Sequence, residues 1–219
     1  MIEKIFVKKA INRSEIEEYL EKKFERAGYS RSEIQRTPLG TRIIVYVHRP
    51  AIVIGRSGRK LQEITKEIAE KFNLENPMID VREIENPFLD ARIVAKRIAK
   101  AIERGINYKK VCNYYLGKIM EAGAIGVKII VSGKIIGKER SSFKKFKDGF
   151  IVHSGHYFDV LVDKAKAQAL VKVGVIGIEV RIMKEMPKEL EIEKEIERGE
   201  KSEGIEDKGI EKAEWARFK

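Results

Sequence analysis

The chain opens with an amphipathic stretch and continues with runs of β-branched residues, a pattern that predicts one helix followed by two strands. The helix is predicted over residues 14–28, because Ser14 begins a capping box at its start. Its apolar face holds Ile16, Tyr19, Leu20 and Phe24. Strands are predicted over residues 32–37 and 41–48, and the Pro-Leu-Gly turn between them indicates a hairpin.

The next apolar run is short and is interrupted by glycine. Residues 49–54 predict a single helical turn, with Pro50 at a favourable first position. Two glycines at Gly-x-x-Gly spacing follow at 55–58, and then a second amphipathic helix over 59–72. A strand over 78–84 completes the order helix, strand, strand, short helix, Gly-x-x-Gly, helix, strand.

The second half of the chain repeats the change from helical to alternating periodicity. Asp163 precedes an Ala-rich stretch, which predicts a capped helix through residue 173. The predicted elements are helices over 87–104, 108–121 and 163–173, strands over 125–132, 158–162 and 176–183, and one or two long strands around turns within 133–158. We summarise this half as helix, three strands, helix, strand.

Together these elements predict an α+β fold with two domains. The N-terminal domain, residues 1–86, has the order α-β-β-α-α-β, and the C-terminal domain, residues 87–186, has the order α-β-β-β-α-β. Residues 187–219 are rich in Glu and Lys and have no pattern that would form a core, so they are expected to be a charged extension.

Charge narrows the class of partner. Charged residues make up 36% of the chain, well above the usual quarter, and residues 1–187 hold 37 Lys and Arg against 23 Asp and Glu. Residues 188–214 reverse this balance, with 6 against 11. A basic body indicates a polyanionic partner. A single cysteine and the lack of an apolar run of about 18 residues favour a reducing cytoplasm and no membrane partner.

The glycine pair occupies the position of a nucleic-acid loop, between a one-turn helix and a longer one. Glycine lets the backbone approach phosphates closely, and the start of the following helix attracts anions. Arg56, Arg59 and Lys60 add cations, while Ile52 and Ile54 are expected to form an apolar floor for unstacked bases. The predicted RNA-binding loop comprises Gly55, Arg56, Ser57, Gly58, Arg59 and Lys60.

Two further basic sets have competing interpretations. A row at every fourth position of the helix predicted over 87–104, formed by Arg92, Lys96, Lys100 and Arg104, is either a nucleic-acid face or a solvated surface. A second set is interleaved with Phe143, Phe146 and Phe150, which favours RNA contact over a solvated hairpin. This second set comprises Lys134, Lys138, Arg140, Lys144, Lys145 and Lys147.

An enzyme is not indicated. No P-loop, nucleophile elbow or paired-acid motif is present. Cys112 lies within a predicted helix and is interpreted as a small packed residue. His153 and His156 have a spacing that could bring two imidazoles together, but polar loop residues are the commoner case. We therefore expect neither a metal site nor a cofactor.

Four parts of the sequence resemble known families. The order of predicted helices and strands around the glycine loop resembles that of the type II KH domain. Residues 121–134, Glu-Ala-Gly-Ala-Ile-Gly-Val-Lys-Ile-Ile-Val-Ser-Gly-Lys, and residues 174–180, Gly-Val-Ile-Gly-Ile-Glu-Val, resemble two signatures of the ribosomal protein S-three family of the small subunit. Residues 148–155 are similar to the archaeal and eukaryotic branch of that family.

The family resemblance implies a place in the head of the small subunit, in contact with ribosomal RNA, neighbouring proteins and the channel where messenger RNA enters. Lys109 and Lys110 match the first two of three basic positions that contact messenger in the bacterial branch, whereas the third is Asn113. Messenger contact is therefore expected without support for unwinding. The alternative is a free KH-type protein that binds single-stranded RNA outside the ribosome.

Overall fold

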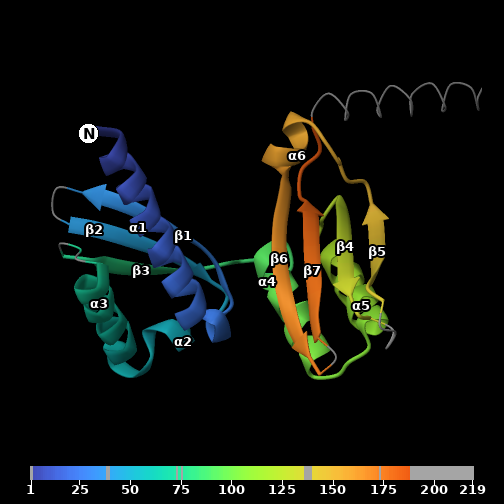
Figure 1. The fold of residues 1–219 in the computed structure, drawn as a ribbon, viewed down its shortest axis with the longest axis horizontal. Helices are drawn as coiled ribbons and strands as arrows, with labels where there is room; N and C mark the ends of the chain where they lie inside the picture. Colours follow the sequence, from blue (N-terminus) through green and yellow to red (C-terminus); the bar gives the residue numbers. More distant parts are fainter. Residues whose placement is uncertain are drawn as a thin grey trace, which may run out of the picture.

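The computed structural model describes residues 2–37, 40–72, 74, 76–135, 140–172 and 174–187. Two sheets organise these residues into separate layers, shown on the left and right of Figure 1. We call the elements from α1 to β3 the N-terminal unit and those from α4 to β7 the C-terminal unit. Within the described ranges, no helix is long and apolar enough to cross a membrane.

The N-terminal unit packs helices against a three-stranded sheet of order β1-β2-β3, in which β1 and β2 are antiparallel and β2 and β3 parallel. Its elements are α1 (Ile2–Lys23), the 3₁₀ turn η1 (Glu25–Ala27), β1 (Tyr29–Thr37), β2 (Gly40–Val47), α2 (Pro50–Ile54), η2 (Arg56–Gly58), α3 (Arg59–Phe72) and β3 (Met78–Glu83). This is the order predicted for a KH domain. One core unites the apolar faces of α1 and α3 with β2, including Leu20, Val45 and Ile68.

The first helix begins earlier than predicted, at Ile2 rather than Ser14. The intervening residues contain no proline or glycine, so the helix continues through the serine instead of starting there. The helix also ends earlier than predicted, at Lys23, and the left-handed Gly28 instead ends the 3₁₀ turn η1 that follows it. In the added turns Val7 and Ile11 are exposed, so these turns contribute little to the core.

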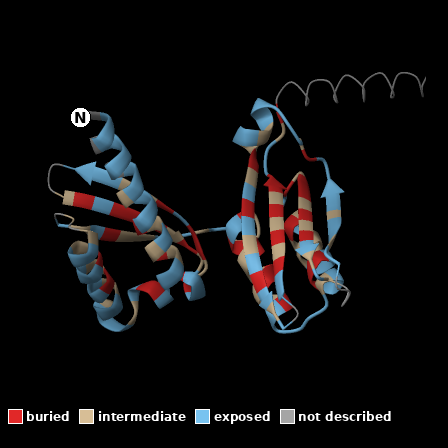
Figure 2. Ribbon diagram, viewed as in Figure 1, coloured by how far each residue is buried: buried red, intermediate tan, exposed pale blue. Residues whose placement is uncertain are grey.

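The C-terminal unit places two helices on one face of a four-stranded antiparallel sheet of order β5-β4-β7-β6. Its elements are α4 (Ala91–Glu103), α5 (Tyr108–Glu121), β4 (Gly126–Gly133), β5 (Ser142–Gly149), α6 (His156–Leu161), β6 (Val162–Val171) and β7 (Gly174–Met183). Buried residues lie between the helices and the sheet (Figure 2). The opposite face of the sheet has no helix of this pair over it and is turned toward the viewer in Figure 1.

The α+β class is confirmed, but the predicted element order of the C-terminal domain is wrong. The observed order is α-α-β-β-α-β-β. The predicted helix over 163–173 is a strand, β6, and the predicted strand over 158–162 belongs mostly to the short helix α6. The alanines at 165, 167 and 169 alternate with exposed Lys and Gln, so the period of two outweighs the helix propensity of alanine. Their small side chains let α4 pack against the strand.

The start of α4 also differs from the prediction. Asn86-Pro87 forms a turn, and the helix begins at Ala91 with Asp90 as its cap, whose Oδ1 accepts a hydrogen bond from Ile93 N at 3.0 Å. Asp163, which was predicted to cap a helix starting at residue 163, lies in β6 and instead caps α4. Its Oδ2 accepts a hydrogen bond from Ala91 N at 2.9 Å. Each such cap contributes about 1 kcal/mol to helix stability. The predicted extension beyond Pro187 lies outside the described residues.

Candidate nucleic-acid interface

The loop between α2 and α3 requires glycine for its backbone. Gly55 and Gly58 have φ values of 71° and 73°, in the left-handed region that other residues rarely adopt. A Cβ added at Gly55 would also lie 2.8 Å from Lys60 Cβ, whereas one at Gly58 would meet nothing within 4 Å. Ser57 adopts φ 54° without being glycine, which is a strained conformation of the kind that gathers at binding sites.

Two cationic side chains of this loop are available to a ligand, and a third stabilises the loop itself. Arg56 and Arg59 are exposed. Lys60 Nζ instead donates to the Ile52 carbonyl oxygen at 3.1 Å, so it links α3 to the end of α2. The N–H of Arg59, the first residue of α3, donates to the Arg56 carbonyl oxygen. The positive end of the α3 dipole still adds to the attraction for an anion.

The apolar residues of α2 lie as predicted for a floor beside the loop. Ile52 and Ile54 are 36% and 39% exposed, while Val53 between them is fully buried. The buried side chain anchors the turn on the core, and the two exposed ones remain at the surface next to the glycines. The binding of bases to them stays a prediction.

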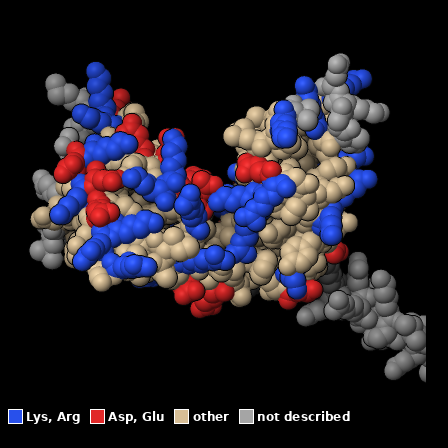
Figure 3. Space-filling model, turned by 90° about the horizontal axis from the view of Figure 1, so that it is seen from below, with Lys and Arg blue, Asp and Glu red and all other residues tan. Residues whose placement is uncertain are grey.

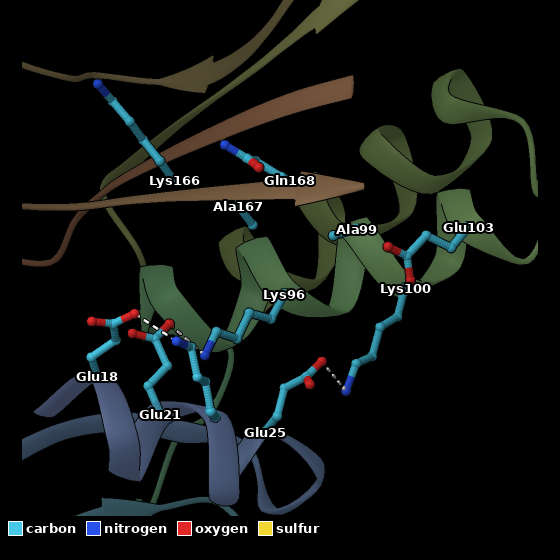
Figure 4. Close-up of a pocket in the computed structure, with 11 residues that line it drawn as sticks. Glu18, Glu21, Glu25, Lys96, Ala99, Lys100, Glu103, Lys166, Ala167 and Gln168 are labelled. Carbon is cyan, nitrogen blue, oxygen red and sulfur yellow. Dashed lines mark hydrogen bonds and ion pairs between the residues drawn. The ribbon is translucent and has the colours of Figure 1, made fainter. Parts of the chain in front are cut away.

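The basic row of α4 has a role that neither sequence interpretation included. Lys96 Nζ lies 2.7 Å from Glu21 Oε1 of the N-terminal unit, and Lys100 Nζ lies 3.1 Å from Glu25 Oε1 (Figure 4). Arg92 Nη1 donates to the Ser30 carbonyl oxygen at 2.9 Å. Three of the four residues therefore hold the two units together. The sequence could not show this, because their partners lie on α1, η1 and β1.

A groove of about 470 Å³ lies at this junction, between α1, α4 and β6. Figure 4 shows lysines of α4 facing glutamates of α1 across it. The lysine charge in the groove is thus largely balanced by Glu18, Glu21, Glu25 and Glu103. A balanced surface does not attract phosphates strongly, so we exclude this groove from the RNA-binding surface.

Lys109 and Lys110 are exposed in the first turn of α5. Val111 and Cys112, the next two residues, are buried and turn the lysines outward. Asn107 caps this helix by accepting from Lys109 N at 3.0 Å. Two cations at the positive end of a helix dipole are unfavourable for the helix itself, and they become favourable when an anion binds there.

The predicted set around β5 is split by strand geometry. Lys145 and Lys147 point to the side of the sheet away from α5, where Lys145 Nζ lies 5.2 Å from the centre of the Phe143 ring. Lys144 points to the α5 side, as does Phe146, whose ring meets Tyr108 at 6.4 Å. Lys134 and Arg140 are exposed next to the strands. Lys138 lies outside the described residues.

The described surface gathers several of these cations at one end. In Figure 1 the loop between α2 and α3 and the start of α5 both lie along the lower edge. Seen from that edge, Lys and Arg side chains spread over both units and across their junction (Figure 3). Sequence reasoning missed Lys128, Lys164 and Arg181, which share the open side of the sheet with Lys145 and Lys147. No local signal marked them, because Lys128 and Arg181 are single cations in their predicted strands and Lys164 belongs to a segment predicted as a helix.

The titratable residues give no support for catalysis. Burial raises the pKa of the Cys112 thiol to about 12, so it is not a nucleophile at neutral pH. Burial, followed by Lys128 and other nearby cations, lowers the pKa of His153, so its imidazole is mostly neutral at pH 7. Among the described residues, no three side chains of His, Cys, Asp or Glu come together as a metal site.

Comparison with known proteins agrees with this picture. Residues 15–89 match the family described as KH domain, and residues 98–182 match the family described as ribosomal protein S3, C-terminal domain. A protein of Methanocaldococcus jannaschii is 44% identical over 90% of this chain and 96% of its own length. One from Hyperthermus butylicus is 45% identical over 84% of this chain and 74% of its own, and one from Methanococcus aeolicus 42% over 90% and 92%. All three are named small ribosomal subunit protein uS3.

Proposed function

The chain belongs to the uS3 family of small ribosomal subunit proteins, and from this membership we propose that it binds ribosomal RNA in the head of the subunit and contacts messenger RNA where it enters. Its role is structural and not enzymatic. Its partners in this proposal are small-subunit ribosomal RNA, messenger RNA and neighbouring small-subunit proteins, in the cytoplasm.

The observation that carries the RNA-binding proposal is the loop of Gly55–Gly58. Its left-handed backbone brings peptide groups to the surface, and the exposed Arg56 and Arg59 flank the start of α3. These features suit the backbone of a single strand, with Ile52 and Ile54 available to unstacked bases.

The messenger contact is assigned to the start of α5. Lys109 and Lys110 are both exposed there and lie at the positive end of the helix dipole. The exposed Asn113, one turn later, is neutral. We therefore assign this helix start to electrostatic contact with messenger and not to its unwinding.

The alternative, a free KH-type RNA-binding protein, lacks an explanation for the C-terminal unit. A single-stranded RNA would be bound by the N-terminal loop, yet the basic surface continues over α5 and β5. A second unit that matches a ribosomal family favours the ribosomal role.

Sedimentation separates the two functions. The tagged full chain, expressed in a related archaeal cell, is expected to co-migrate with small subunits through sucrose gradients in high salt. Weak electrostatic binding is screened under these conditions, whereas an assembled component stays bound. Recovery only from the free fractions at the top of the gradient would contradict the ribosomal assignment.

A further inference from the structure

The open face, defined as the side of sheet β5-β4-β7-β6 opposite α4 and α5, carries a row of cations across all four strands. Lys147 pairs in register with Lys128, Lys128 with Arg181, and Arg181 with Lys164. Neighbouring strands lie about 4.8 Å apart, so the row spans about 14 Å. The next row toward the lower edge in Figure 1 contains Lys145 and Lys166, together with Ile130 and Glu179.

Carboxylates neutralise only part of this charge. Arg181 Nε bonds Glu179 Oε1 at 2.6 Å, and Lys164 Nζ bonds Asp159 Oδ1 at 2.6 Å. Within the described residues, no carboxylate lies within ion-pairing distance of Lys128, Lys145 or Lys147. Six cations thus share this face with one strand carboxylate and one from α6.

The cations are crowded enough to disturb one another. Burial lowers the pKa of Lys128, and the charges of Arg181, Lys145 and Lys147 lower it further, while Glu179 raises it only in part. Repulsion of this kind costs free energy in the unbound protein, and a bound anion would remove the cost. The sheet therefore holds a group of charges that is better suited to an anionic partner than to water.

A small apolar cluster covers one end of the open face, and the cation rows beyond it are accessible. Ile151, Val162 and Met183 form a small buried cluster at that end, with Phe158 packed against it. The Phe158 ring lies 4.0 Å from Lys164 Nζ and 5.1 Å from Arg181 Cζ, which supports both cations from one side. Beyond the two cation rows, Val175 and Leu170 are 51% and 72% exposed.

We propose that the open face binds the phosphate backbone of a folded, double-stranded RNA segment. The proposal rests on the proposed function and adds a second RNA surface to it, separate from the glycine loop. Cations spaced evenly along a row match phosphates and carry no sequence preference. Single strands need a series of aromatic rings on which successive bases stack. On this face Phe158 is packed beneath cations, and Phe143, which is 62% exposed on β5, is a single ring with Lys145 Nζ 5.2 Å from its centre. A stable protein interface has an apolar centre, whereas the centre here is charged.

The test uses the full chain and two fluorescein-labelled RNAs, a short hairpin and an oligouridylate, with affinity measured by fluorescence anisotropy. The open-face variant is Lys145→Glu with Lys147→Glu. Glu at 147 would lie opposite Lys128, and opposite charges across strands stabilise a sheet, so the variant is expected to fold. Its control is Lys4→Glu with Lys8→Glu, an identical charge change on exposed turns of α1. The loop variant is Arg56→Asp with Ser57→Asp, since Asp tolerates the left-handed conformation.

The open-face variant is expected to weaken hairpin binding by about tenfold relative to its control, and to change oligouridylate binding by less than about twofold. The loop variant is expected to do the reverse. Hairpin affinity equal to the control, or equal weakening of both RNAs, would overturn the open-face assignment alone. If the loop variant also left oligouridylate binding unchanged, the proposed function would fail as well. Should charge reversal lower the unfolding midpoint, Lys145→Gln with Lys147→Gln gives the same comparison.

Discussion

Residues 1–86 contain 17 Lys and Arg against 14 Asp and Glu, whereas residues 87–187 contain 20 against 9. The N-terminal unit, which has the recognisable glycine loop, is thus close to neutral, and several of its cations are paired, as in Arg42 with Asp80 and Lys23 with Glu67. The C-terminal unit has most of the excess charge but no short motif that reveals it. We therefore propose that the N-terminal unit supplies the binding loop for RNA and the C-terminal unit most of the long-range attraction.

The largest effect on the C-terminal unit is expected from a change that separates the edge strand β5 from β4. A Cβ added at Gly126 would overlap the Phe150 carbonyl oxygen, so Gly126→Ala is expected to cost about 3 kcal/mol or more and to release β5 from β4. Hydrogen exchange should then rise in the C-terminal unit and stay unchanged in the N-terminal unit. The hairpin affinity should fall while oligouridylate binding persists.

A matched substitution in the same unit gives the control. Gly117 lies within α5 with nothing within 4 Å of an added Cβ, so Gly117→Ala is expected to stabilise the helix by about 1 kcal/mol. Equal destabilisation by the two substitutions would show that the close approach of β4 and the chain at Phe150 is not what constrains Gly126.

The attraction assigned to the C-terminal unit can be measured at the start of α5. Lys109→Gln with Lys110→Gln removes two exposed cations and should weaken binding of oligouridylate by several-fold at low salt. The slope of log affinity against log salt should become shallower by about 1.4, at about 0.7 for each phosphate that is no longer neutralised. Titrations at several salt concentrations measure this slope. A slope equal to that of Lys4→Gln with Lys8→Gln would remove α5 from the RNA-binding surface.

The smallest expected effect concerns the junction. Lys96 and Lys100 pair with glutamates across a partly exposed boundary, and such pairs contribute less than about 1 kcal/mol each. Lys96→Gln with Lys100→Gln should therefore leave the unfolding midpoint nearly unchanged. It should broaden the distribution of distances between the units, measured by small-angle X-ray scattering, as high salt should in the unmodified chain. A large loss of stability would mean that the two units fold as one.

The sequence predicted the N-terminal unit better than the C-terminal one for a physical reason. Proline and glycine mark its turns, and each helix has a local apolar stripe, as on the α3 residues Ile64 and Ile68. In β6 the alanines favour a helix by propensity, whereas their alternation with polar residues and the pairing with β7 along ten residues make the segment a strand. Pairing partners distant in sequence are not visible in a local pattern.

The residues of the candidate site that belong to a local motif could be predicted from the sequence, whereas those brought together by strand pairing could not. The loop cations Arg56 and Arg59 and the α5 residue Lys109 are exposed as the sequence indicated, because each belongs to a local motif. The open-face row unites Lys128, Lys164 and Arg181 only through the strand register, and sequence order does not contain that register. The α4 row was misinterpreted for a related reason, since its acidic partners lie on α1 and η1, far earlier in the chain. The domain boundaries and the RNA contacts themselves remain predictions.

Both units are expected to contact RNA within the small subunit, and the contacts can be mapped on the intact particle. Ultraviolet crosslinking of purified small subunits, followed by mass spectrometry of nucleotide-bearing peptides, identifies the residues that touch RNA. We predict crosslinked peptides from the glycine loop, residues 55–60, and from the C-terminal unit, around Lys109 and residues 143–147. Crosslinks confined to one unit, or found only on the charge-balanced groove between α1 and α4, would contradict the assignment of RNA binding to both.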